Sequence, residues 1–86
     1  MDEFTLEDLH RIYIIVPNDY GPGTVNRTVA EMSDRQFSWW VKEKAKLEGI
    51  RMILPIGRVG HQTRLYMLNR MAQQGVKIYK LADPKP

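Results

Sequence analysis

The stretch Ser33-Asp-Arg-Gln-Phe-Ser-Trp-Trp-Val-Lys-Glu-Lys-Ala-Lys-Leu-Glu-Gly49 predicts the most sharply bounded element of this chain. Ser33 is a favoured N-cap residue, and Gln36, three positions later, completes a capping box. Gly49 stands where a glycine in the left-handed conformation commonly ends a helix. The sequence therefore predicts a helix at about 33–48.

The predicted helix is amphipathic, and one of its two tryptophans lies off the apolar side. At 100° per residue, Phe37, Trp40 and Val41 share an apolar arc, whereas Trp39 falls on a face rich in lysine and arginine. An indole on such a face can stack on a base or hold a cationic side chain. Alternatively, Trp39 belongs to a second small core under the N-terminal segment. Both interpretations stay open.

The second half of the chain has the pattern strand, helix, strand. Ile50-Arg-Met-Ile-Leu54 is apolar and ends at Pro55, which is typical of a strand. A helix is expected from about His61 to Gln74, where Gly75 stops it, and residues 76–81 begin with the alternation of a strand. Two parallel strands joined through a helix would form a right-handed crossover.

The first third of the chain is less clearly patterned. We expect a helical turn at 5–10, a strand at about 11–16 and a loop at 17–23, whereas residues 24–32 fit a strand or a short helix. The predicted fold class is α+β, a small three- to four-stranded sheet with two helices (about 33–48 and 61–74) packed on one face, including one right-handed βαβ unit. Residues 1–82 are expected to form a single small globular domain and residues 83–86 a frayed tail.

Composition bounds the class of protein. The chain has 86 residues, of which 43% are hydrophobic, and it contains no cysteine, so disulfides, thiolate nucleophiles and cysteine-based metal sites are excluded. The N-terminus lacks a basic leader followed by an apolar run, and no apolar run is long enough to cross a bilayer. We therefore expect a cytoplasmic location and no association with membranes.

Charge is distributed unevenly along the sequence. Residues 1–50 hold six Lys/Arg and nine Asp/Glu, a net charge of −3, whereas residues 51–86 hold seven Lys/Arg and one Asp, a net charge of +6. A basic half suggests an anionic partner, most commonly a nucleic acid. The alternative is that the two halves fold against each other and that their opposite net charges neutralise each other.

The turn before the second helix and the polar side of that helix form a candidate nucleic-acid site. A helix N-terminus with free N–H groups attracts anions, and arginines nearby could hold the same phosphate. The polar side carries amides, a phenol and an arginine, which can donate to or accept from base edges. The candidate residues are Gly57, Arg58, Gly60, Gln62, Arg64, Tyr66, Asn69, Arg70 and Gln73, with Trp39 as a further aromatic contact. A glycine pair at a turn is also ordinary backbone geometry.

The sequence gives little support for catalysis. His10 and His61 are the only imidazoles and lack the spacing of metal ligands. The carboxylates near the N-terminus resemble a solvated first turn rather than a paired acid and base. We expect no enzyme activity, no cofactor and no metal.

These observations favour a small, basic, non-catalytic binding module whose partner is a nucleic acid. The alternative is a protein–protein interaction module, such as a small inhibitor or an accessory subunit that binds a larger protein, with Trp39, Tyr66 and Arg70 as the main contacts. A homodimer formed through the same surface is a third alternative. We find no resemblance on which a family assignment could rest.

Overall fold

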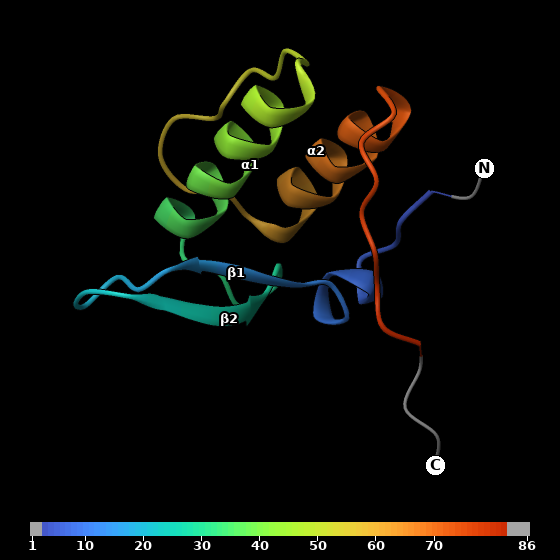
Figure 1. Ribbon diagram of the computed structural model, residues 1–86. Helices are drawn as coiled ribbons and strands as arrows, with labels where there is room; N and C mark the ends of the chain where they lie inside the picture. Colours follow the sequence, from blue (N-terminus) through green and yellow to red (C-terminus); the bar gives the residue numbers. More distant parts are fainter. Residues whose placement is uncertain (1–2, 83–86) are drawn as a thin grey trace.

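The computed structural model describes residues 3–82, so the tail expected at 83–86 lies outside the described residues. The elements follow in the order η1 (Glu7–His10), β1 (Tyr13–Pro17), β2 (Thr24–Thr28), α1 (Asp34–Glu48) and α2 (His61–Gln73). Figure 1 shows that both helices lie on the same side of the β1–β2 hairpin. The α+β class is confirmed.

Residues 24–32 fitted a strand or a short helix in the sequence, and the structure shows that this segment begins with the second strand of a hairpin. β1 and β2 pair antiparallel, with Tyr13 opposite Thr28 at one end and Pro17 opposite Thr24 at the other. The N–H of Asn18 donates to the carbonyl of Gly23 across the connecting loop at 3.0 Å. Gly23 has a φ of +89°, which a side chain would strain, so a glycine closes this loop.

The first turn of α1 is built as the sequence predicts. Ser33 Oγ accepts a hydrogen bond from the N–H of Gln36 at 3.1 Å, and Gln36 Oε1 accepts one from the N–H of Ser33 at 3.0 Å. Gln36 Nε2 also donates to the carbonyl of Pro17 at 2.9 Å, which ties the helix to the end of β1. Gly49 ends the helix with a φ of +69°.

Replacing Ser33 by alanine should therefore destabilise the protein. The N–H of Gln36 would lose its acceptor in a half-buried position, and N-cap substitutions of this kind cost about 1 kcal/mol. Urea unfolding of Ser33→Ala and Ser33→Thr measures the effect. Threonine also caps helices and keeps the hydroxyl that hydrogen-bonds to Asp19. Ser33→Thr should therefore retain most of the stability, and equal losses for both variants would contradict a role as a cap.

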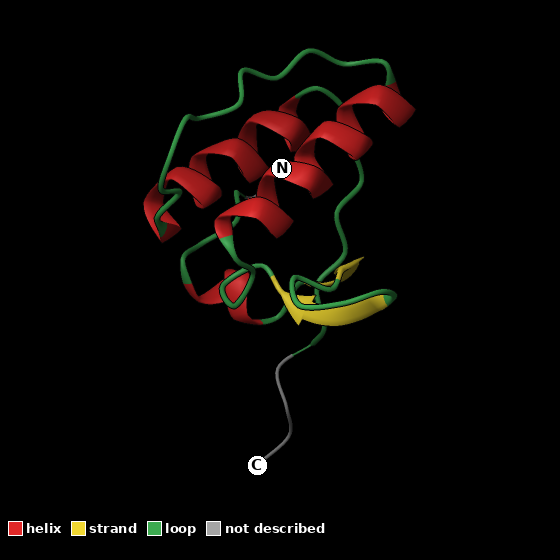
Figure 2. Cartoon of the chain, turned by 90° about the vertical axis from the view of Figure 1, so that its left-hand side faces the viewer, coloured by secondary structure: helices red, strands yellow, loops and turns green. Residues whose placement is uncertain are grey.

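The two helices run side by side in nearly the same direction (Figures 1 and 2). Because both begin at the hairpin, the chain must return along them between Gly49 and Gly60, and it does so without a helix or strand. After α2, residues 76–82 run back along that helix toward the hairpin end (Figure 1). One backbone hydrogen bond, from the N–H of Leu81 to the carbonyl of Arg11 at 2.9 Å, ties this segment to the chain before β1.

The core lies between the helices and the hairpin. Phe37 and Val41 of α1, Leu68 and Met71 of α2, and Val16 of β1 are completely buried. Trp40 is almost completely buried and packs near Phe37, at 6.0 Å between ring centroids. This core fixes the two helices against each other and so positions the surface between them.

Two expected strands are not confirmed, and with them the three- to four-stranded sheet and the βαβ unit. The described residues contain a single sheet, of two strands. Residues 50–54 pass along the helices with no neighbouring strand, and Ile53 is almost fully exposed. Residues 76–79 do alternate between more and less buried positions, but this segment runs along α2 and not beside a strand (Figure 1). Without a neighbouring strand, neither segment can form a ladder of backbone hydrogen bonds.

Candidate nucleic-acid interface

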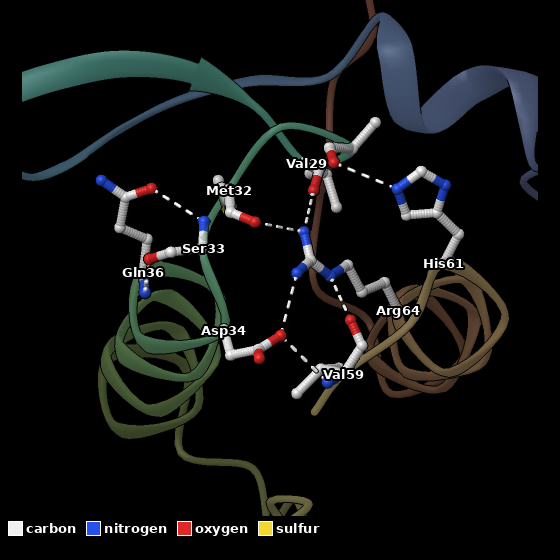
Figure 3. Close-up of polar contacts among 9 residues, drawn as sticks. Val29, Met32, Ser33, Asp34, Gln36, Val59, His61 and Arg64 are labelled. Carbon is white, nitrogen blue, oxygen red and sulfur yellow. Dashed lines mark hydrogen bonds and ion pairs between the residues drawn. The ribbon is translucent and has the colours of Figure 1, made fainter. Parts of the chain in front are cut away.

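Arg64, expected to bind phosphate, lies inside the protein. Its side chain points from α2 into the junction of three segments (Figure 3), and the residue is 5% exposed. Nη1 donates to the carbonyls of Val29 and Met32, both at 2.7 Å, and Nε donates to the carbonyl of Val59 at 2.8 Å. A guanidinium engaged in this way is not available to a ligand.

Two further contacts complete the surroundings of Arg64. Nη2 lies 3.3 Å from Oδ1 of Asp34, and the guanidinium carbon lies 5.3 Å from the centroid of the Phe37 ring. Burial lowers the pKa of Arg64, while the hydrogen bond and the charge of Asp34 raise it. Arginine stays protonated at neutral pH in any case. The phosphate-binding role expected for Arg64 is therefore corrected to a structural one.

Asn69 is likewise occupied by the fold. Its Oδ1 accepts a hydrogen bond from the N–H of Phe4 at 2.8 Å, and its Nδ2 lies 3.5 Å from the carbonyl of the same residue. The side chain thereby fastens the N-terminal segment to α2. The side-chain amide of Asn69 therefore has a structural role and not the nucleic-acid contact expected from the sequence.

The turn from Gly57 to Gly60 leads directly into α2. Gly57 has a φ of +87°, and Gly60 is the N-cap of α2, where no side chain caps the helix. Arg58 is exposed, and Val59 is buried and donates its N–H to Asp34 Oδ1 at 3.0 Å. His61 is held at the same end by a 3.1 Å contact between its Nε2 and the carbonyl of Ala30 (Figure 3).

The remaining candidate residues of α2 lie on its exposed surface, and two of them border a depression. Gln62 and Gln73 are exposed and lie outside it, whereas Tyr66 and Arg70 line it. The depression, which we call the basic groove, has a volume of about 980 Å³ between α1, α2 and the returning loop. It is lined by Lys42, Ala45, Ile50, Arg51, Met52, Ile53, Leu54, Pro55, Thr63, Tyr66, Met67 and Arg70.

Trp39 borders a second, smaller hollow next to the basic groove. This hollow has a volume of about 280 Å³ and is lined by Pro17, Arg35, Gln36, Ser38, Trp39, Lys42 and Leu54. Lys42 and Leu54 line both depressions, so the two are neighbours. Trp39 is 39% exposed, which places part of the indole at the surface rather than in a second core.

Cations dominate the charge of the basic groove. Lys42, Arg51 and Arg70 line it, and the described residues that line it include no carboxylate. None of the ion pairs among residues 3–82 involves these three cations. Positive charge beside apolar walls concentrates the electrostatic potential, which favours an anionic ligand that also carries apolar surface.

Two of the cations that line the groove, Lys42 and Arg51, were not predicted from the sequence. Arg51 was assigned to a strand and Lys42 to the helix at 33–48, so neither was expected near Tyr66 and Arg70. The lack of carboxylates between Arg51 and Ala82 was the available signal, because it ensures that the loop and α2 contribute only positive charge. Whether α1 also adds positive charge to the groove depends on how the two helices pack.

Comparisons with protein-family models, with curated proteins and with solved structures return no match for this chain. In the described part of the chain, no three or more His, Asp or Glu side chains form a group that could hold a metal ion. None of the described helices is long and apolar enough to span a bilayer.

Proposed function

We propose that this chain is a small non-catalytic module that binds nucleic acid through the basic groove. The observation that carries the proposal is the convergence of Lys42, Arg51 and Arg70 on one depression whose described lining includes no carboxylate. Phosphate groups supply most of the affinity of proteins for nucleic acids, and Lys and Arg are their usual partners.

The surface proposed here differs from the one expected from the sequence. Tyr66 and Arg70 stay in it, and Lys42 and Arg51 join them from α1 and the loop. Arg58 follows directly after the loop, is exposed and offers a further phosphate contact. Gln62 and Gln73 are exposed on α2 outside the groove, where they can contact a ligand that extends beyond it.

Removing the three groove cations together should weaken binding and its dependence on salt. We expect Lys42→Gln, Arg51→Gln, Arg70→Gln to bind a mixed-sequence oligonucleotide about 10- to 30-fold more weakly at low salt, because three phosphate contacts are lost. The slope of log K against log salt concentration should become shallower by about 2 to 3. Fluorescence anisotropy of a labelled oligonucleotide between 50 and 200 mM salt measures both quantities.

A matched control separates the groove from general positive charge. Arg27, Lys46 and Lys77 are exposed and do not line the groove, so Arg27→Gln, Lys46→Gln, Lys77→Gln removes the same charge elsewhere. This control should keep most of the affinity. Equal losses for the two triple variants would show that the groove has no special role, and an absence of binding at low salt would refute the proposal.

A protein partner is the second candidate, and the loop favours it. Ile56 is fully exposed and Ile53 almost so, which is unusual for a pair of large apolar side chains in one loop. Together with Trp39, Tyr66 and Arg70 they could anchor a protein surface. Such an interface should weaken much less as salt rises than a complex made through phosphates.

A further inference from the structure

We infer that the nucleic acid recognised by the basic groove is single-stranded and that its bases enter the groove and stack on Tyr66 and Trp39. The inference rests on the proposed function and specifies the ligand of the same site. It follows from three properties of the surface: its concave shape, the chemistry of its walls, and the presence of aromatic and cationic side chains in both depressions.

The concave shape suits a strand whose bases are free. An intact duplex keeps its bases stacked inside and presents phosphates and groove edges, which are read by protruding helices or strands. Here the polar side of α2 does not protrude alone, because the loop at 50–55 flanks it and encloses a depression of about 980 Å³. A base that is already unpaired can enter such a depression without the cost of breaking a pair.

The walls of the groove offer apolar surface for the faces of bases beside the cations that suit the phosphates. Apolar side chains from the loop and α2 form much of the lining, including Ile50, Met52, Leu54 and Met67. Tyr66 lines the groove from α2 and is 63% exposed, so much of its side chain is accessible to a ligand. Flat apolar rings of bases bury well on surfaces of this composition, and stacking on an aromatic residue is tolerant of sequence.

The side chains that line the two neighbouring depressions fit a strand that lies along both. Trp39 borders one depression, Tyr66 borders the other, and Lys42 lines both. A phosphate at Lys42 would then lie between two stacked bases, with Arg51 and Arg70 available for the phosphates that follow in the larger groove. Alternation of aromatic platforms with cations is the usual construction of single-strand binding surfaces.

The decisive experiment compares ligands that share phosphates and differ in their bases. Labelled dT12, rU12, a dA12–dT12 duplex and a twelve-residue abasic strand are titrated with the whole chain at one low salt concentration. We expect dT12 or rU12 to bind at least tenfold more tightly than both the duplex and the abasic strand. The reason is that neither of these two offers an unpaired base that can stack on Tyr66 or Trp39. The comparison of dT12 with rU12 distinguishes DNA from RNA as the source of the strand.

Variants at Tyr66 test the stacking itself. Tyr66→Ala should weaken the binding of the preferred strand about tenfold and leave duplex and abasic binding within twofold, whereas Tyr66→Phe should retain the affinity of the unmodified protein. Because Tyr66 is largely exposed, both variants are expected to fold, which thermal unfolding checks. A loss with Tyr66→Phe equal to that with Tyr66→Ala would overturn stacking as the cause.

Tryptophan fluorescence reports on the second platform. Trp40 is 4% exposed and Trp39 is 39% exposed, so quenching by a bound base arises from Trp39. Quenching by the preferred strand, its absence with the abasic strand and its loss in Trp39→Phe would support a base at this position. No quenching by a strand that binds tightly would overturn the placement of a base on Trp39.

The outcomes separate this inference from the proposal beneath it. If the duplex and the abasic strand bind as tightly as dT12 and rU12, the inference is wrong while nucleic-acid binding stands. If none of the four ligands binds at low salt, both the inference and the proposed function are wrong, and a protein partner becomes the candidate for the groove.

Discussion

Replacing Arg64 by methionine is expected to lower the free energy of unfolding by about 3–5 kcal/mol, the range found when one partner of a buried ionic network is removed. The acceptors explain the size of the effect. Three of them are main-chain carbonyls, of Val29, Met32 and Val59, and no compensating substitution can remove a carbonyl. Methionine fills a similar volume but leaves all three without a donor in the interior.

The loss should approach the total stability of the protein. Small domains have free energies of unfolding of roughly 5–15 kcal/mol, and a chain of this length is near the size at which a single core suffices. We therefore expect Arg64→Met to be partly unfolded at 37 °C. Urea unfolding at 10–25 °C, followed through the fluorescence of the buried Trp40, measures the difference.

Arg64→Lys tests whether charge alone is enough. A lysine keeps the positive charge near Asp34 but cannot direct donors to three carbonyls in the plane of a guanidinium. We expect it to lose nearly as much stability as Arg64→Met. Arg58→Met is the matched control, because Arg58 is exposed, and it should change stability by less than about 0.5 kcal/mol. A tolerated lysine would show that electrostatic attraction, and not the set of hydrogen bonds, holds this junction.

Arg64 has a structural role because the fold has so little sheet. Val29 and Met32 lie in the connection between β2 and α1, and Val59 precedes α2, so one side chain joins two connections that are far apart in sequence (Figure 3). Carbonyls in such connections lack the partners that a helix or sheet would give them, and a buried carbonyl must be paired. The guanidinium of Arg64 supplies hydrogen-bond donors to these carbonyls, which no neighbouring strand pairs with.

The helical wheel contained part of this information. On a helical wheel Arg64 falls between Leu68 and Met71, on the apolar side of its helix, so binding a phosphate requires its long side chain to reach out to solvent. The structure shows the opposite direction. Whether an arginine leaves or enters the core depends on acceptors contributed by distant segments, and these cannot be read from the helix alone.

Local signals in the sequence predicted local structure well. The capping box of Ser33 and Gln36, the stop at Gly49 and the stop near Gly75 place both helices within a residue or two of their observed bounds. Each of these signals involves neighbours in sequence, so no knowledge of packing is needed to interpret it. The strand at 11–16 was predicted on similar grounds, from a β-branched run ended by Pro17.

The segment at 76–81 shows what alternation can and cannot predict. Val76 is buried and Ile78 half-buried, while Lys77 and Tyr79 are exposed, so the period of two is correct for the first four residues. The pattern records which side chains face the core, and an extended segment packed on a helix satisfies it as well as a strand does. Pairing requires a second extended segment alongside, and the loop at 50–54 passes along a different side of the helices.

The basic groove could not be predicted in its present form. Its walls come from α1, α2 and the loop between them, and the expected βαβ unit would have placed that loop inside a sheet. Tyr66 and Arg70 were identified because the polar side of α2 is visible in the sequence. Lys42 and Arg51 were not, because their proximity to α2 depends on two helices lying side by side in the same direction.

Asp8 is the second charged group on which the fold depends. It is 2% exposed, and its Oδ1 accepts hydrogen bonds from Arg11 Nη2 at 2.6 Å and from Lys80 Nζ at 3.0 Å. Its Oδ2 accepts the N–H of Thr5, two residues before η1, at 2.9 Å. The carboxylate thus joins the N-terminal turn to the C-terminal segment, next to the hydrogen bond between Leu81 and Arg11.

These contacts set the pKa of Asp8 and, through it, a dependence of stability on pH. Burial alone would raise the pKa, but the hydrogen bonds from Arg11, Thr5 and Lys80 outweigh it and hold the pKa well below its ordinary value of 3.8. A carboxyl group whose pKa is lower in the folded state stabilises the fold when it is ionised. This contribution is fully present above about pH 5 and is lost as the pH falls below 3.8 and through the lower folded-state value.

Asp8→Asn should therefore lower the free energy of unfolding by about 2 kcal/mol at pH 7 and by progressively less as the pH approaches 2. Most of the loss comes from Arg11 and the turn at Thr5, because the side chain of Lys80 is 43% exposed and its pairing is screened by water. Urea unfolding of both proteins between pH 2 and pH 7 gives the two curves. Glu48→Gln, at an exposed position of α1, is the matched control and should run parallel to the unmodified protein. If Asp8→Asn also runs parallel to it, with a constant offset over the whole range, the loss arises from packing and not from the ionised carboxylate.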